Sequence, residues 1–235
     1  MDAGIRAAVQ RSHLRALPDD VLDGLMARAV RTRIPRGSVT HREGEDPPHL
    51  ELVVSGVVRV FVTAQDGRTM TIRYCRSGAL IGAISLFATG FAMPASTQAL
   101  VDAELLRLSP PAVQRAVTRD VRVAHALLGE LADRALGFAR ELQGSAFATV
   151  RERVARHLLD LASERAAHPE DLARREFVVS VSQRELAEAV GTVREVVVRV
   201  LRELREDGVV RTGRDRIVIV DPLRLVQEQG WNSRH

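Results

Sequence analysis

Residues 182–208 constrain the fold more than any other stretch, because they carry two separate signals for the start of a helix. Ser182 is followed three positions later by Glu185, and Thr192 is followed in the same way by Glu195. A hydroxyl residue with Glu three positions on is typical of a helix start, since the two side chains can satisfy free backbone N–H groups there. Two starts ten residues apart predict a short helix, a turn and a second helix.

Glycines mark the turn and the end of this unit. Gly191 lies just before the second predicted start and Gly208 follows the second helix, and glycine adopts the left-handed backbone conformation without steric cost. Apolar residues fall at spacings that gather them on inward faces: Leu186, Val190, Val197, Val200, Leu201 and Leu204. The stretch therefore predicts a helix-turn-helix, the motif whose second helix enters the major groove of DNA.

The early turns of the second predicted helix carry Arg194, Glu195 and Arg199. Arg can donate paired hydrogen bonds to O6 and N7 of guanine, and Glu can accept one from N4 of cytosine. The alternative is a solvated, ion-paired helix face, because Glu195 and Arg199 are also four residues apart. The two helix starts and the turn between them favour base reading.

Two short strand-like runs around Gly213 follow and predict a β-hairpin beside the second helix. A helix-turn-helix followed by a hairpin is a winged helix. Three arginines cluster at the predicted tip, where they can meet phosphates or simply keep the surface solvated: Arg211, Arg214 and Arg216.

Composition restricts the function classes. The net charge of +4 over 235 residues is too small to indicate nucleic-acid binding by itself. A single cysteine excludes intrachain disulfides, cysteine-ligated iron-sulfur clusters and the usual structural zinc sites. No secretory signal and no run of 18 apolar residues stands out, so we expect a cytoplasmic protein with no membrane partner.

The first half of the chain is predicted to be rich in β-strands. It is followed by a predicted helix with a regular row of apolar residues along one face, which we call the seam. Between residues 30 and 108, short apolar or alternating runs are separated by glycines about every ten residues, which predicts a compact antiparallel barrel or jelly roll. The seam has members three and four residues apart in turn: Val121, Ala124, Leu128, Leu131, Ala135, Phe138 and Leu142. It can lie against its own barrel, but it most simply forms a parallel homodimer that reads two half-sites. A further helix is expected from Phe147.

The order of these parts resembles the CRP/FNR family of bacterial transcription regulators over nearly the whole chain. A GxxxGxxxLF pattern at residues 78–87 is similar to the effector-pocket loop of that family, and Arg194, Glu195 and Arg199 are similar to the recognition helix of its CRP branch. The resemblance implies an α+β fold with an N-terminal antiparallel β-roll (a jelly roll like that of cyclic-nucleotide-binding domains), a long dimerisation helix and a C-terminal winged helix-turn-helix. The expected ranges are 1–118, 119–146 and 147–235.

The resemblance also implies the partners. A homodimer would bind double-stranded DNA at a palindrome with TGTGA-like halves, and RNA polymerase as well if the chain is an activator. The residues expected at the DNA are Ser182, Gln183, Arg184, Thr192, Val193, Arg194, Glu195 and Arg199.

The predicted sensor departs from the cyclic AMP pattern. Relatives that bind cyclic AMP carry a Glu for the ribose hydroxyl and then an Arg and a Ser for the phosphate, whereas the matching positions here hold Ala83, Met93 and Pro94. A phosphate loses its charge-assisted hydrogen bonds in such a loop, so we expect that cyclic AMP is not the effector. Phe138 and Ala139 likewise stand where that branch has hydroxyl residues. The expected pocket residues are Gly82, Ala83, Met93, Pro94 and Phe138.

An apolar pocket leaves three alternatives open: haem or another apolar ligand, a different small metabolite, or no ligand. Residues 93–95 resemble haem-linked nitric-oxide regulators of the same family. Residue type makes five side chains candidate axial ligands, although each is more typical of an ordinary packed or surface residue: His41, His49, His125, Cys75 and Met93. Cys75 is also a candidate thiol sensor, but a lone cysteine at the end of an apolar strand is more typical of a buried, inert thiol.

Two other function classes compete with a DNA-binding regulator. A cupin-like metal enzyme needs a His-x-His pair with a Glu and a further His, whereas His41 and His49 are eight residues apart, so we assign no catalytic residue and no metal ligand. A winged helix that binds protein instead of DNA is the second alternative, and the arginines at the start of the second helix argue against it. We therefore predict a regulator and not an enzyme.

Overall fold

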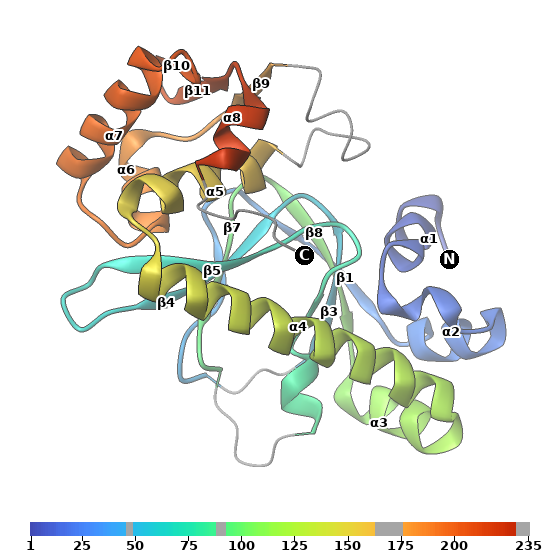
Figure 1. Ribbon diagram of the computed structural model, residues 1–235. Helices are drawn as coiled ribbons and strands as arrows, with labels where there is room; N and C mark the ends of the chain where they lie inside the picture. Colours follow the sequence, from blue (N-terminus) through green and yellow to red (C-terminus); the bar gives the residue numbers. More distant parts are fainter. Residues whose placement is uncertain (46–48, 88–92, 163–175, 229–235) are drawn as a thin grey trace. The chain divides into compact units, whose positions relative to one another are not determined.

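The computed structural model describes residues 1–45, 49–87, 93–162 and 176–228 (Figure 1). The chain divides into two compact units, which are described separately. The first unit consists of Met1–Val62 and Ile72–Ala139, and the second of Thr63–Thr71 and Arg140–His235.

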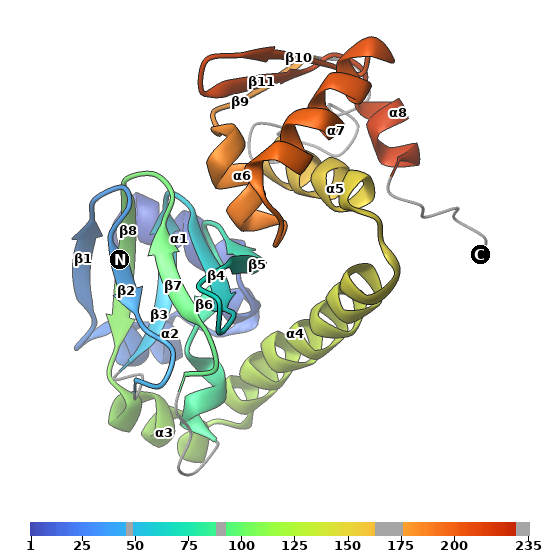
Figure 2. The ribbon, with the colours of Figure 1, turned by 90° about the vertical axis from the view of Figure 1, so that its left-hand side faces the viewer.

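Two four-stranded sheets dominate the first unit, and the strand pairs described in them are antiparallel (Figure 2). One sheet has the order β1-β8-β3-β6 and the other β2-β7-β4-β5. The strands are β1 (Val30–Ile34), β2 (Val39–His41), β3 (Leu50–Ser55), β4 (Val58–Thr63), β5 (Thr69–Cys75), β6 (Leu80–Ile81), β7 (Ser96–Ala99) and β8 (Ala103–Leu108). This arrangement confirms the predicted antiparallel β-roll.

Strand β3 shows how the sequence builds this unit. Successive side chains of a strand point to opposite faces, so Leu50 and Leu52 share one face and Val53 lies on the other. Leu50 and Leu52 join a core with the N-terminal helices, whereas Val53 joins a core made by residues of both sheets. Both faces of β3 are therefore covered. The helices of the unit are α1 (Ala3–Gln10), α2 (Asp19–Met26), α3 (Pro110–Arg119) and the part of α4 (Val121–Phe147) that ends at Ala139, with short 3-10 helices at His13–Ala16 and Ala83–Leu86.

Helix α4 packs on the first unit through one face only. Val123 and Leu127 are fully buried in the core of that unit. Most of the predicted seam lies on another face, where Leu128 and Phe138 are more than half exposed in the single chain. Apart from the half-buried Ala124 and Leu131, the described seam residues are exposed, so the alternative in which the whole seam packs on its own barrel is wrong. The Leu142 side chain lies outside the described residues.

The second unit is a helical domain with a small sheet. Its elements are α5 (Val150–Ala162), β9 (Phe177–Val179), α6 (Gln183–Ala189), α7 (Arg194–Glu206), β10 (Val210–Gly213), β11 (Arg216–Ile219) and α8 (Pro222–Gln227), and the sheet order is β10-β11-β9. The helix expected from Phe147 begins at Val150, because α4 continues through Phe147. Strand β9 was not anticipated from the sequence.

Both predicted helices are present, but only the first of the two predicted capping pairs is confirmed, and the second, Thr192 with Glu195, is wrong. At α6, the Ser182 hydroxyl accepts a hydrogen bond from the backbone N–H of Glu185, and the Glu185 carboxylate accepts one from the backbone N–H of Ser182. Helix α7 instead begins at Arg194, and its cap residue Val193 makes no side-chain capping bond. The reason is that Thr192 still belongs to the turn, where its backbone N–H donates to Ala187.

The glycine positions of the helix-turn-helix are confirmed. Gly191 and Gly208 have φ angles of 69° and 72°, in the region that favours glycine. The hairpin that follows turns at Arg214 and Asp215, so Gly213 is the last residue of β10 and does not form the turn itself. A winged helix-turn-helix results (Figure 2).

Candidate functional site

The outer face of α7 carries the side chains expected to read DNA. Its inner face is fixed by burial of Val197 and Leu204 in the core of the second unit, which leaves Arg194, Glu195 and Arg199 exposed. Glu195 and Arg199 form no ion pair with each other in the described structure. The predicted alternative of an ion-paired face is therefore not what this part of α7 shows.

A groove of about 360 Å³ lies beside the start of α7 in the second unit. Four of the predicted DNA-binding residues contribute to its wall, together with the hairpin: Ser182, Gln183, Arg184 and Arg194, and Thr212–Arg216. Thr192, Val193, Glu195 and Arg199 lie outside the wall. The groove thus brings Arg194 together with the hairpin residues Arg214 and Arg216.

The predicted hairpin arginines are not equivalent. Nη2 of Arg211 lies 2.6 Å from Oε2 of Glu176, so this arginine is ion-paired within the protein. Arg214 and Arg216 are exposed beside the groove. These two are better placed than Arg211 to contact phosphates.

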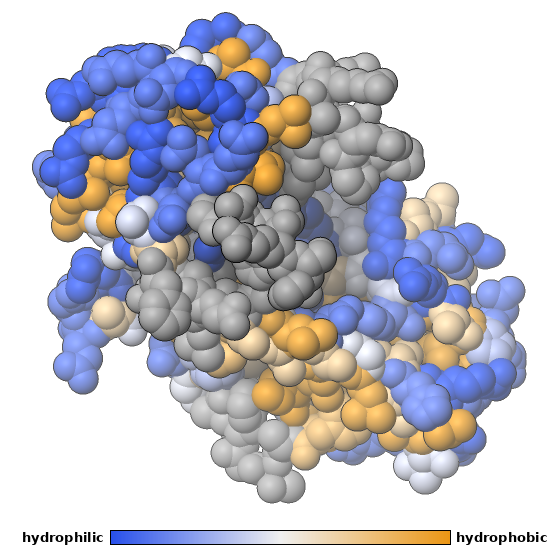
Figure 3. Space-filling view, in the orientation of Figure 1, coloured by the Kyte–Doolittle hydropathy of each residue, from blue (hydrophilic) through white to orange (hydrophobic). Residues whose placement is uncertain are grey.

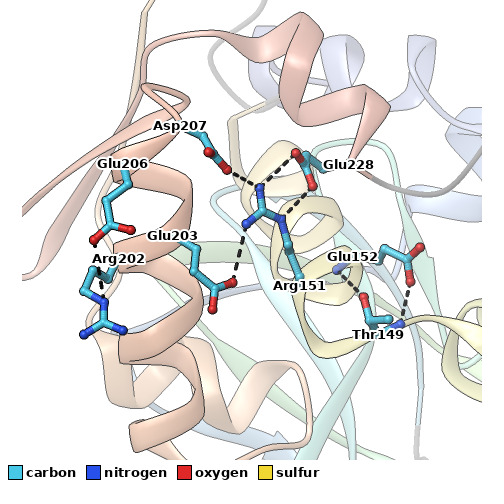
Figure 4. A network of polar contacts seen from close by, with 8 residues as sticks. All are labelled: Thr149, Arg151, Glu152, Arg202, Glu203, Glu206, Asp207 and Glu228. Atoms are coloured by element: carbon cyan, nitrogen blue, oxygen red, sulfur yellow. Dashed lines mark hydrogen bonds and ion pairs between the residues drawn. The ribbon is translucent and has the colours of Figure 1, made fainter.

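Arg151 fixes the end of α7 to the neighbouring helices, as Figure 4 shows. From the first turn of α5, its guanidinium donates to Glu228 at 2.7 and 3.0 Å, to Asp207 at 2.6 Å and to Glu203 at 3.4 Å. The hydrogen bonds to Glu228 and then to Asp207 raise the pKa of Arg151 above its ordinary value. Arg151 thereby ties α5, α7 and α8 together. Sequence reasoning missed it, because one arginine among 34 basic residues carries no motif.

A cavity of about 470 Å³ lies within the first unit. Four of the five predicted pocket residues line it: Gly82, Met93, Pro94 and Phe138. The fifth, Ala83, is instead fully buried in the hydrophobic core next to the loop. Gly82 has a φ of 87°, and a Cβ atom there would lie 2.6 Å from the backbone oxygen of His49. The loop therefore requires glycine at this position.

Charged side chains line this cavity beside the apolar ones that the sequence led us to expect. Nη2 of Arg73 and Nε of Arg134 lie 3.1 and 3.0 Å from the same oxygen, Oε1 of Glu130. Arg134 also donates to the backbone oxygen of Leu80. Burial and the neighbouring Arg73 lower the pKa of Arg134 from its ordinary value. The loop motif could not reveal these residues, because they come from β5 and α4.

The candidate haem ligands do not gather at the cavity. Met93 contributes to its lining, whereas the others do not: His41, His49, His125 and Cys75. His41 is buried with its Nε2 atom 3.0 Å from Oε2 of Glu51, and burial raises the pKa of the Cys75 thiol. His13, which was not a candidate, lies in the lining with its Nε2 atom 2.9 Å from Asp133. In the described ranges, no three His, Cys, Asp or Glu side chains are placed to hold a metal ion.

Two family models match the chain. Residues 31–120 match a cyclic nucleotide-binding domain, and residues 152–228 match a Crp-like helix-turn-helix domain. In the described part of the chain, no helix is long and apolar enough to cross a membrane. Fold and matches together define a transcription regulator with a helix-turn-helix DNA-binding domain.

Similar proteins agree with this class. The cAMP-activated global transcriptional regulator Vfr of Pseudomonas aeruginosa is 30% identical over 203 residues, which cover 84% of this chain and 92% of Vfr. The CRP-like protein Clp of Xanthomonas campestris pv. campestris is 28% identical over 231 residues, which cover 93% of this chain and 98% of Clp. The chain belongs to the CRP/FNR family of transcription regulators. These relatives are regulators and not enzymes, which confirms that prediction.

Solved structures show the same fold. The structure of the c-di-GMP responsive global regulator CLP of Xanthomonas campestris matches with a TM-score of 0.73 at 27% identity. The match covers 86% of this chain and 99% of the CLP chain. A CRP/FNR-family regulator from Thermus thermophilus has a TM-score of 0.72 at 26% identity, covering 87% of this chain and 100% of its own.

Proposed function

We propose that the chain is a homodimeric regulator that reads a palindrome with TGTGA-like halves. Residues 1–118 would form the sensor, 119–146 the dimerisation helix and 147–235 the DNA-binding domain. The observation that carries the proposal is the exposed, unpaired arrangement of Arg194 and Glu195 at the start of α7, beside the hairpin groove. The proposed contact residues are Ser182, Gln183, Arg184, Thr192, Val193, Arg194, Glu195 and Arg199. RNA polymerase would be a further partner of an activator.

A gel-shift titration tests this proposal directly. The purified chain should bind a duplex with two inverted TGTGA halves more tightly than a duplex of the same composition in which one half is scrambled. A dimer that reads both halves loses half of its base contacts on the second duplex, and each mismatched base pair typically costs about 1–3 kcal/mol. Equal binding of the two duplexes would contradict a two-fold symmetric reader.

The dimer proposal is supported by the exposed apolar face of α4. Figure 3 shows hydrophobic side chains gathered over this part of the first unit. Exposed apolar residues on α4 include Val121, Leu128 and Phe138, each more than half exposed in the single chain. A patch of this kind on a helix marks an interaction surface, and the seam spacing suits an identical helix.

We propose further that cyclic AMP is not the effector, although Vfr is described as cAMP-activated and CLP as c-di-GMP responsive. The residues at the matching loop positions do not fit a cyclic phosphate: Ala83 and Met93 are buried and apolar, and Pro94 has no N–H donor. Calorimetric titration with cyclic AMP should give no saturable heat. Tight one-site binding would refute the proposal.

Any effector acts by favouring one arrangement of the dimer. A ligand that binds two arrangements equally shifts nothing, so it must contact groups that differ between them. Helix α4 supplies both the cavity residues Glu130 and Arg134 and the exposed seam residue Leu128. Ligand contacts on α4 are therefore placed to bias the dimer. Haem is a second candidate ligand because Met93 lines the cavity, and a Soret band in the purified protein tests it.

A further inference from the structure

We propose that the cavity of the first unit binds a small organic anion with an apolar body, whose carboxylate is held by Arg73 and Arg134. The inference rests on the proposed function in one respect, that this unit is the sensor. The arginines proposed to bind the carboxylate do not belong to the loop at residues 78–87 that resembles the effector-pocket loop of the family. The two arginines come from β5 and α4, and neither belongs to a sequence motif that pointed to a ligand.

Two arginines of the cavity wall share one carboxylate. Arg73 and Arg134 both donate to Oε1 of Glu130, and only 5% of Glu130 is exposed. Two guanidiniums and one carboxylate leave one net positive charge in this cluster. The nearby Asp133 carboxylate is 70% exposed at its side chain and lies 2.9 Å from His13. Asp133 also lines the cavity and attracts Arg73 electrostatically. Because its side chain is largely exposed, solvent screens this attraction, so Asp133 offsets the positive charge of the cluster less than a buried carboxylate would.

The guanidiniums also have hydrogen-bonding capacity for a ligand. A guanidinium carries five N–H donors. In the contacts described for Arg73, one donor goes to Glu130, and those described for Arg134 use Nε for Glu130 and Nη2 for Leu80. Charge-assisted hydrogen bonds to a carboxylate are among the strongest that a protein forms, and burial strengthens them. A carboxylate at this cluster would neutralise the excess charge.

The rest of the wall selects an apolar body. Aliphatic and aromatic side chains face the same space: Val60, Ile72, Ile81, Met93 and Phe138. A volume of about 470 Å³ lies within the usual range for small-ligand sites. Sugar hydroxyls placed against these side chains would lack partners, at a cost in binding free energy. The wall therefore fits a carboxylate with a hydrocarbon chain or ring better than a nucleotide.

The proposal is tested by calorimetric titration of the full chain with sodium octanoate and with sodium decanoate, each below its micellar concentration. The neutral counterparts are 1-octanol and 1-decanol, which have the same chain lengths without the charge. We expect at least one carboxylate to saturate one site per chain and to bind roughly tenfold or more tightly than its alcohol. Equal affinity for acid and alcohol, or no binding by either acid, would overturn the proposal. This comparison uses the unaltered chain.

Single substitutions then locate the site. Arg134→Gln and Arg73→Gln should each weaken carboxylate binding roughly tenfold and leave alcohol binding unchanged. Arg122→Gln is the matched control, because Arg122 also lies on α4 but binds Asp120 and does not line the cavity. Retention of carboxylate binding by both cavity variants would overturn the assignment to these arginines. DNA binding by the unaltered chain is measured separately, so a failed regulator and a failed anion site give different results.

Discussion

Nη2 of Arg151, at the start of α5, lies 2.6 Å from Oδ2 of Asp207, the residue that caps the end of α7. The same guanidinium also binds Glu228, the residue that caps the end of α8, so one side chain links three helices of the second unit (Figure 4). The orientation of the proposed reading helix therefore depends on a residue that does not lie on it.

Replacing Arg151 should destabilise the DNA-binding unit. Arg151→Gln removes bidentate bonds to Glu228 and leaves three carboxylates close together, so we expect a loss of about 1–3 kcal/mol in the free energy of unfolding. Urea denaturation measures it. Arg202→Gln is the matched control, because its contact with Glu206 is a long, exposed pair of 3.8 Å that should contribute less than about 0.5 kcal/mol. Equal effects of the two changes would show that the network does not hold the unit.

Base reading and phosphate contact can be separated by substitution. Arg194→Ala should cost about 1–3 kcal/mol on the best site and relax the preference at one base pair. Arg214→Ala should instead weaken binding to all sequences alike and reduce the slope of log affinity against log salt by about one. Competition assays on single-base variants of the site distinguish the two patterns. Uniform weakening by Arg194→Ala would make Arg194 a phosphate contact.

Two leucine substitutions on α4 test the proposed dimer interface. Leu128 and Leu136 are the same residue type on the same helix, with exposures of 58% and 57% in the single chain, but only Leu128 lies at a seam position. Leu128→Glu should convert the dimer into a monomer, because it buries a charge in the helix interface, whereas Leu136→Glu should leave the dimer intact. Sedimentation velocity reports both. Dissociation by both variants, or by neither, would contradict a dimer through this seam.

A buried ion cluster in the β-roll predicts how stability depends on pH. Glu51 is fully buried, with Nε2 of His41 3.0 Å and Nε of Arg107 2.8 Å from its two oxygens. Burial alone would raise the pKa of Glu51, but the bonds to His41 and Arg107 outweigh it and lower that pKa below its ordinary value. A carboxyl whose pKa is lowered by folding contributes stability above its unfolded pKa and loses it as the pH falls through the folded pKa.

The expected result is a loss of stability in acid that depends on this carboxylate. Urea midpoints measured from about pH 7 down to about pH 3 should decrease once the pH drops below the ordinary pKa of Glu, about 4.3. Glu51→Gln should lower stability at pH 7 by about 2–4 kcal/mol, because it leaves the buried His41 and the partly buried Arg107 without their carboxylate, and it should flatten the acid dependence. An unchanged acid slope in the variant would assign the dependence to other groups.

Local signals in the sequence predicted the fold well where they depend on backbone geometry. Ser182 with Glu185 predicted the start of α6, and Gly191 and Gly208 predicted a turn and a helix end. Both kinds of signal could be recognised because capping hydrogen bonds and glycine turns involve only residues close together in the sequence. Thr192 failed because its N–H is used by the preceding turn, a contact that its own sequence neighbours do not reveal.

Long-range contacts set the limit of prediction at the sites. The loop positions of Gly82, Met93 and Pro94 could be anticipated from a motif, whereas Arg73, Glu130 and Arg134 meet only after β5 and α4 pack together. Arg151 likewise meets Glu228 across 77 residues of sequence. The charged cluster in the cavity and the ion pairs that hold α7 in place both depend on residues that are far apart in the sequence.

The most direct test of the central claim is selection of bound sequences from random duplex DNA by the purified full-length chain. A homodimer that reads bases with Arg194, Glu195 and Arg199 should enrich a palindrome with TGTGA-like halves, with half-sites about one helical turn apart. The selection is repeated with sodium decanoate present, because the dimer could require an effector in order to bind DNA. Enrichment of no sequence under either condition would contradict the account of the chain as a sequence-specific DNA reader.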